Sequence, residues 1–154
     1  MAGFLASLRR GNLMKLDYSV LQSAIERLGE SIAFTQNAKQ EKDLKIYSLG
    51  RTSTIKSFEF CYELACKMLR RHLEVTEHSE SYVDTMTFPN LLKFAAERGV
   101  IAEPLRWMEY IKDRNKTVHG YDEGVAEDIY CDIDAFFIDV QAMLDNMKAR
   151  HDAH

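Results

Sequence analysis

A stretch of helical periodicity about thirty residues long, from about Leu44 to Val75, is the feature that most constrains how this chain folds. Apolar residues recur along it at steps of three and four and form one broad face: Ile55, Phe58, Cys61, Tyr62, Ala65, Met68, Leu69 and Leu73. A helix of this length measures about 45 Å. Phe60 and Leu64 add a second apolar side, which predicts packing against more than the chain itself, and we therefore expect a homodimer. Gly50 is a candidate for a kink near the start.

Two further segments keep the same periodicity. The first predicts a helix over about 17–40, with one apolar line: Tyr18, Leu21, Ile25, Leu28, Ile32 and Thr35. The second predicts a helix that runs to the end of the domain: Ile129, Ile133, Phe136, Phe137, Val140, Met143, Leu144 and Met147. No strand pattern or repeat stands out between them.

Local signals place the shorter helices. Thr87 before Phe88-Pro89 is typical of a helix N-cap with proline in the first turn, and Gly99 of the stop. A second short helix begins at Pro104 and is expected to end near 119–120, and Asp122 caps the last helix. The polar stretch 78–84 is expected to be a loop.

The predicted fold is therefore all-α: an antiparallel four-helix bundle plus a short extra helix. Only two prolines and seven glycines occur among 154 residues, which favours long helices in one domain. We expect a disordered or frayed extension over 1–13, the helical bundle over 14–150 and a solvated tail over 151–154.

Net charge, cysteines and hydropathy indicate which ligands and which compartment suit this chain. A formal net charge of −4 argues against nucleic-acid binding by bulk electrostatics, although a small basic cleft is compatible with it. Cys61, Cys66 and Cys131 form no disulfide framework, which fits free thiols in a reducing cytoplasm. No apolar run approaches the ~20 residues of a membrane span, so we expect a cytoplasmic protein without a membrane partner.

The stretch from Asp113 to Glu123 carries a permanent cation, a titratable imidazole and a phenol within eight residues: Arg114, His119 and Tyr121. On an ideal helix Arg114 and His119 point about 140° apart and cannot converge on one atom. Two arrangements resolve this. Gly120 ends the helix and lets His119 and Tyr121 turn back, or a dimer axis places two copies of the segment around one cleft.

These groups suit the cleavage of RNA by transesterification. His119 can take the proton of a ribose 2′-hydroxyl or protonate the leaving 5′-oxygen, and Arg114 can hold the phosphoryl oxygens. Asn115 can orient the imidazole or bind phosphate. The sequence has no tight cluster of metal ligands, so neither a metal nor another cofactor is expected. Spacing alone also fits a plain helix end, where His119 contacts the last carbonyls and Tyr121 only packs.

Two blocks resemble a known family. Phe58–Lys67 is similar to the long helix, and Trp107–Glu123 to the active-site helix and turn, of HEPN-domain toxins paired with minimal nucleotidyltransferase antitoxins. This group is also labelled nucleotidyltransferase substrate-binding proteins. The resemblance covers about 16–147.

The resemblance implies roles for three residues. Arg114 and His119 correspond to the catalytic pair of a metal-independent endoribonuclease. Tyr121 corresponds to the tyrosine that the partner nucleotidyltransferase modifies with AMP, which silences the toxin. An RNA substrate, with tRNA as one candidate, and a dimeric cleft are implied as well.

Two charged groups on the long helix each allow two roles. Glu59, Glu63 and Lys67 form either a solvated ladder or, for the glutamates and Glu63 in particular, a set that orients Arg114 or His119 across the bundle. The basic cluster Arg70-Arg71-His72 is either a common helix-end feature or a contact for substrate phosphate. The alternatives to a ribonuclease are a subunit that presents a nucleotide or substrate to a nucleotidyltransferase, and a structural helical dimer.

Overall fold

Every regular element of the computed structural model is a helix in the part it describes, residues 16–77, 80–118 and 120–152. The elements are α2 (Ser19–Gln40), α3 (Leu44–Thr76), α4 (Glu80–Asp84), α5 (Phe88–Glu97), α6 (Pro104–Lys116) and α7 (Glu123–Asp152). None of the described helices is long and apolar enough to cross a membrane. The predicted all-α bundle is confirmed.

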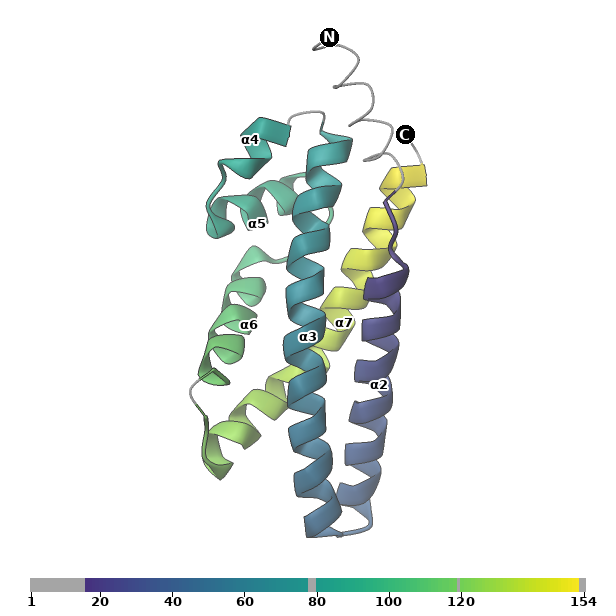
Figure 1. The fold of residues 1–154 in the computed structure, drawn as a ribbon, viewed down its shortest axis with the longest axis vertical. Helices are drawn as coiled ribbons and strands as arrows, with labels where there is room; N and C mark the ends of the chain where they lie inside the picture. Colours follow the sequence, from purple (N-terminus) through teal and green to yellow (C-terminus); the bar gives the residue numbers. More distant parts are fainter. Residues whose placement is uncertain (1–15, 78–79, 119, 153–154) are drawn as a thin grey trace.

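The long helix α3 organises the molecule. Figure 1 shows α2 beside it as an antiparallel hairpin, α7 crossing both, and α4, α5 and α6 following one another along its other side. Residues of the expected apolar lines are buried, among them Leu28, Ile55, Leu69 and Ile133. Burying each such side chain contributes about 1.5–3 kcal/mol, so the core is shared by α2, α3 and α7.

An aromatic cluster fixes α6 against this core. Phe136 of α7 lies at its centre, with ring centroids 5.0 Å from Phe58 of α3, 5.8 Å from Trp107 and 5.3 Å from Tyr110 of α6. Edge-on pairs at such distances add about 0.5–1.5 kcal/mol each beyond burial. The Tyr110 hydroxyl also donates to Asp139 Oδ2 of α7 at 2.5 Å. The helix that carries Arg114 is therefore held by both long neighbours.

Gly50 does not kink α3, which continues from Leu44 to Thr76. Its role is a close approach of α2 and α3, because a Cβ at Gly50 would lie 2.5 Å from Thr35 Oγ1. The Thr35 hydroxyl is buried, and it is bound to Ser31 O at 2.8 Å and lies 3.1 Å from Thr54 Oγ1. Because two partners hold the Thr35 hydroxyl, it cannot move far from a Cβ added at Gly50.

We expect Gly50→Ala to destabilise the protein by about 1 kcal/mol. Overpacking costs about 1–3 kcal/mol, while the gain in helix propensity offsets about 1 kcal/mol. The urea midpoint measures the effect. Gly124→Ala is the matched control, since its Cβ would meet nothing closer than Asp122 Oδ1 at 3.5 Å, and it should be neutral or stabilising. A Gly50→Ala protein as stable as Gly124→Ala would contradict the close approach.

The local start signals are confirmed. Thr87 Oγ1 accepts from Asn90 N, and Asp122 Oδ1 accepts from Val125 N at 2.9 Å. Cys61, Cys66 and Cys131 are free thiols, as expected. The homodimer remains a prediction, with Phe60 of the second apolar side 53% exposed on the single chain.

Three boundaries differ from the sequence-based expectation. Residues 80–84 of the expected loop form the short helix α4, whose Val83 is buried and whose Val83 carbonyl accepts from Arg70 at 2.8 Å. The helix α6 ends at Lys116 rather than near 119–120. The last helix continues to Asp152, and His151 packs edge-on against Tyr18 at 5.8 Å instead of lying in a solvated tail. The expected boundary between residues 13 and 14 lies outside the described residues.

Candidate functional site

Arg114 lies near the end of α6 and faces α3. It follows Tyr110 by four residues and Trp107 by seven, so it shares the buried side of its helix. Its Nη2 donates to Glu63 Oε1 at 2.5 Å. The hydrogen bond from Arg114 to Glu63 raises the pKa of the guanidinium, against a small opposing effect of burial. This is a contact across the bundle of the kind expected for the glutamates of α3, and its role in a reaction remains a prediction.

Both partners of this ion pair stay accessible. The side chains of Arg114 and Glu63 are 32% and 47% exposed. Glu63 occupies one guanidinium nitrogen, while a guanidinium has five N–H donors in a planar fork. Arg114 therefore keeps donors for an anion approaching from solvent, with its direction set by Glu63.

Glu59 lies one turn before Glu63 and does not bond Arg114. Its Oε2 is 3.4 Å from Lys56 Nζ. Its charge contributes weakly to the raised pKa of Arg114. Of the two predicted supporting glutamates, Glu63 touches Arg114 and Glu59 acts on it only through space.

The chain leaves the helix directly after Arg114. The Thr117 hydroxyl donates to Arg114 O at 2.6 Å and closes the last turn. Asn115 is exposed, and its carbonyl accepts from Val118 N at 3.3 Å. Gly120 has φ +77°, a conformation that favours glycine. His119 lies outside the described residues, so its side chain is not placed. The helix thus ends before His119, and the alternative of two segments around a dimer axis remains a prediction.

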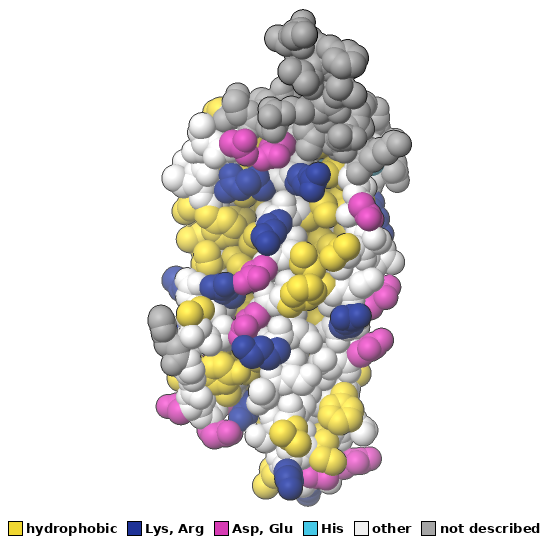
Figure 2. All heavy atoms as spheres, viewed as in Figure 1, with side chains coloured by type: hydrophobic (Ala, Val, Ile, Leu, Met, Phe, Trp, Pro, Cys, Tyr) yellow, Lys and Arg dark blue, Asp and Glu magenta, His cyan; other side chains and the backbone are white. Residues whose placement is uncertain are grey.

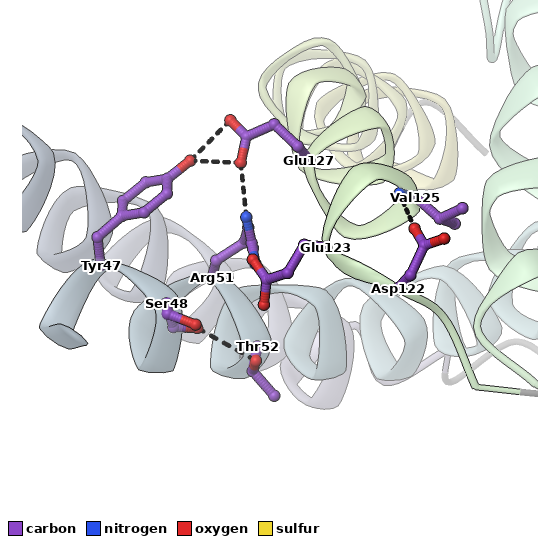
Figure 3. Close-up of polar contacts among 8 residues, drawn as sticks. All are labelled: Tyr47, Ser48, Arg51, Thr52, Asp122, Glu123, Val125 and Glu127. Atoms are coloured by element: carbon purple, nitrogen blue, oxygen red, sulfur yellow. Dashed lines mark hydrogen bonds and ion pairs between the residues drawn. The ribbon is translucent and has the colours of Figure 1, made fainter. Parts of the chain in front are cut away.

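Tyr121 and Asp122 lead into α7. Tyr121 is half-buried and packs against the hydrophobic core. The Asp122 side chain caps the first turn, and Figure 3 shows this bond at the start of the helix. Arg114 and Tyr121 thus sit on two helix ends joined by one short connection.

A second ion-pair network, not predicted from the sequence, holds the start of α7. Arg51 of α3 is 5% exposed and binds Glu123 and Glu127 of α7, the latter at 2.8 Å. The Tyr47 hydroxyl donates to both Glu127 oxygens at 2.8 Å (Figure 3). Burial favours a higher pKa for Glu127, but bonds from Arg51 and Tyr47 outweigh it and lower the pKa.

The signal for this network was present in the sequence. Arg51 falls four residues before Ile55, on the buried face of α3, where a guanidinium requires partners. Glu63 and Arg51 lie twelve residues apart, about 18 Å along the helix. The helix α3 therefore fixes both ends of the segment, one at Arg114 and the other at Glu123.

Asp113 is a buried carboxyl next to Arg114. It is 4% exposed, and Lys116 Nζ lies 3.6 Å from its Oδ1. Burial raises the pKa of Asp113 to about 7, the nearby Asp132 carboxyl of α7 adds to the rise, and Lys116 opposes it. The folded protein therefore favours a protonated Asp113 where the end of α6 packs near α7.

This raised pKa predicts how stability depends on pH. The unfolded Asp113 titrates near 3.8 and the folded one near 7, so the folded state holds the extra proton between these values. Stability is therefore expected to fall as pH rises from about 4 to about 7 and to level off above. Asp113→Asn should flatten this decline in thermal unfolding, whereas Asp128→Asn, an exposed carboxylate on α7, should leave it unchanged. An unaltered decline in Asp113→Asn would contradict the raised pKa of Asp113.

The thiols of Cys61 and Cys66 do not supply a nucleophile at neutral pH. Burial raises the pKa of Cys61 and of Cys66 to about 12. The thiolate is the reactive form, so candidate chemistry centres on Arg114 and the segment that follows it.

Comparisons with known proteins agree on one family. Residues 16–149 match the family described as "Nucleotidyltransferase substrate binding protein like". The chain is 28% identical over 144 residues to "Probable ribonuclease HepT" of Haemophilus influenzae, covering 89% of this chain and 95% of that protein. It is also similar to the solved structure of HI0074 from the same species, with 26% identity, a TM-score of 0.79, and coverage of 86% of this chain and 99% of the other. That structure is described as revealing the fold of a substrate binding domain of a nucleotidyltransferase.

Proposed function

This chain belongs to the nucleotidyltransferase substrate-binding family of HEPN-type proteins, and from this premise we propose that it is a metal-independent endoribonuclease toxin controlled by a minimal nucleotidyltransferase. The observation that carries the proposal is the Arg114 side chain, which is 32% exposed. It is held by Glu63 at the end of α6, five residues before His119. The similarity to a protein named probable ribonuclease HepT supports the same activity.

The reaction divides between two side chains. The ribose 2′-oxygen attacks phosphorus, the bond to the 5′-oxygen breaks, and a cyclic phosphate forms. His119 takes the proton of the 2′-hydroxyl while water protonates the leaving 5′-oxygen, or His119 protonates the 5′-oxygen while water takes the proton of the 2′-hydroxyl. Arg114 stabilises the charge on the phosphoryl oxygens with donors that Glu63 leaves unused.

Supporting groups follow from their positions. Glu63 sets the direction of the Arg114 fork, and Glu59 adds negative potential behind it. Asn115 is exposed one residue further on and offers an amide to phosphate or to the imidazole. In a homodimer, two such sites would share one cleft.

Control acts through Tyr121 in this proposal. The partner nucleotidyltransferase transfers AMP from ATP to the Tyr121 oxygen, which loses its proton as pyrophosphate leaves. This places an anionic phosphate and an adenosine in the segment that follows Arg114. The family description and the HI0074 structure both refer to a nucleotidyltransferase, which supports a partner of this class.

The test is cleavage of total cellular RNA and purified tRNA by the purified chain in EDTA. Cleavage that persists in EDTA would support the proposal. Protein that carries no AMP by intact mass and still leaves RNA intact would contradict it.

A second candidate is a subunit that binds substrate for the nucleotidyltransferase and cuts nothing. The description of HI0074 as a substrate binding domain favours it. It predicts nucleotide-dependent labelling of the chain by the partner without any RNA cleavage, so the EDTA assay separates the two functions.

A further inference from the structure

A hollow of about 270 Å³ lies between α3 and α5, beyond the Arg114 site. Its lining residues are Cys66, Lys67, Arg70, Arg71, Glu74, Phe88 and Leu91. Three cations face one carboxylate there, although the whole chain carries a net charge of −4. Such a local excess of positive charge on an acidic protein attracts a polyanion to one place.

The hollow begins on α3 one helical turn after Glu63, the partner of Arg114, because Lys67 lines it. Its Cys66 thiol lies close enough to Arg70, Glu63 and Arg114 for all three charges to act on its pKa. Glu63, Lys67 and Arg71 follow each other at steps of four along one line of α3. From Glu63 to Arg71 this line extends about 12 Å. An extended chain held at Arg114 can thus continue along α3.

The three cations of the hollow differ in whether they are bonded to the protein or exposed to solvent. Arg70 Nη1 donates to Val83 O at 2.8 Å and holds α4 against α3. Lys67 and Arg71 are exposed. Figure 2 shows dark blue Lys and Arg side chains over the half of α3 nearer its C-terminal end, beside hydrophobic surface toward α5.

The opposite wall is apolar. Half-buried Phe88 and buried Leu91 of α5 line it. A wall of this kind beside cations suits a ligand with alternating phosphates and flat or carbon-rich groups, which describes a single-stranded nucleic acid.

We propose that this hollow binds the RNA backbone next to the cleaved phosphodiester, with Lys67 and Arg71 as phosphate ligands and Phe88 as the contact for an adjacent ribose or base. The proposal rests on the ribonuclease function and extends it to the path of the substrate. The bond that breaks lies at Arg114, and the neighbouring nucleotides lie along α3.

The experiment measures binding apart from cleavage. A fluorescent single-stranded RNA oligonucleotide is titrated with His119→Ala protein at several KCl concentrations, with and without Lys67→Gln/Arg71→Gln. Losing two phosphate contacts should weaken binding and lower the slope of log affinity against log salt by about 1.4. With His119 present, the same pair should raise KM more than it lowers kcat.

Two matched variants test the assignment. Lys42→Gln/Lys45→Gln removes the same charge from exposed residues at the turn between α2 and α3, and it should keep the slope of the parent protein. Lys67→Arg/Arg71→Lys keeps the charges and should keep most of the slope.

Each outcome separates the two proposals. Equal slopes in the Lys67/Arg71 and Lys42/Lys45 variants would overturn the binding site, even if the wild-type protein cleaves RNA. The salt slope could fall only in the Lys67→Gln/Arg71→Gln variant while wild-type protein free of AMP cleaves no RNA. This result would support the binding site and overturn the ribonuclease function. No RNA binding by any form would overturn both.

Discussion

Replacing His119 by alanine is expected to lower RNA cleavage by about 10²–10⁴-fold, the usual contribution of a general acid or base. Arg114→Ala should lower it by about 10²–10³-fold, because the developing charge on phosphorus loses its main donor. Initial rates on a defined RNA in EDTA, measured from pH 5 to 9, give both effects. The pH dependence near neutrality should disappear with His119.

Arg106→Ala is the matched control for Arg114→Ala. Arg106 lies on the same helix, is exposed, and binds Asp139 through Nε at 2.9 Å. Arg106 binds Asp139 through two nitrogens and the Asp139 side chain is only 12% exposed, so removing Arg106 should cost at least as much stability as removing Arg114. Only Arg114→Ala should lose cleavage. Equal losses in both would assign the effect to α6 as a whole and would contradict the role of the Arg114 fork.

Arg114→Lys tests whether geometry or charge matters. Lysine keeps the charge but loses the planar fork that can serve Glu63 and a phosphate at once. We expect activity between wild type and Arg114→Ala, through kcat rather than KM. A fully active lysine variant would reduce Arg114 to a general source of positive potential.

Features decided by neighbouring residues could be predicted from the sequence. The apolar lines of α2, α3 and α7 depend on steps of three and four, and the starts at Thr87 and Asp122 depend on one side chain and a nearby amide. The end of α6 could not be placed as well. Val118 follows Lys116 but is 56% exposed and continues no apolar line, and the Thr117 hydroxyl that closes the last turn is a weak signal.

Features decided by distant residues were missed for a physical reason. Arg51 and Glu127 are 76 positions apart, so their pairing depends on how α7 crosses α3. The Asp113–Asp132 pair depends on the same crossing. The short helix α4 forms where Val83 is buried and its carbonyl meets Arg70. Glu63 could be singled out as a candidate, because its position on α3 was known, whereas its contact with Arg114 required the packing of α6.

Addition of AMP to Tyr121 is expected to reduce RNA cleavage to the level of the Arg114→Ala protein. The modified phenol would carry a phosphate anion and an adenosine seven residues after Arg114. That anion would occupy the guanidinium donors that the RNA phosphate needs, and its bulk would exclude the RNA chain. The measurement pairs intact mass with cleavage rate, before and after incubation with the partner nucleotidyltransferase and ATP.

Tyr121→Phe separates modification from folding. Tyr121 is half-buried against the core, and phenylalanine keeps that packing while removing the acceptor hydroxyl. The variant should cleave RNA and resist silencing, whereas Tyr82→Phe, at a 60% exposed tyrosine of α4, should be silenced like wild type. A Tyr121→Phe protein that still gains the AMP mass and loses activity would show that another residue is modified.

Because the Asp122 cap and the Arg51–Glu123 ion pair fix the backbone that follows Tyr121, the phenol has little freedom to swing aside. An AMP group added there would remain near the end of α6, which is why one modification is expected to suffice.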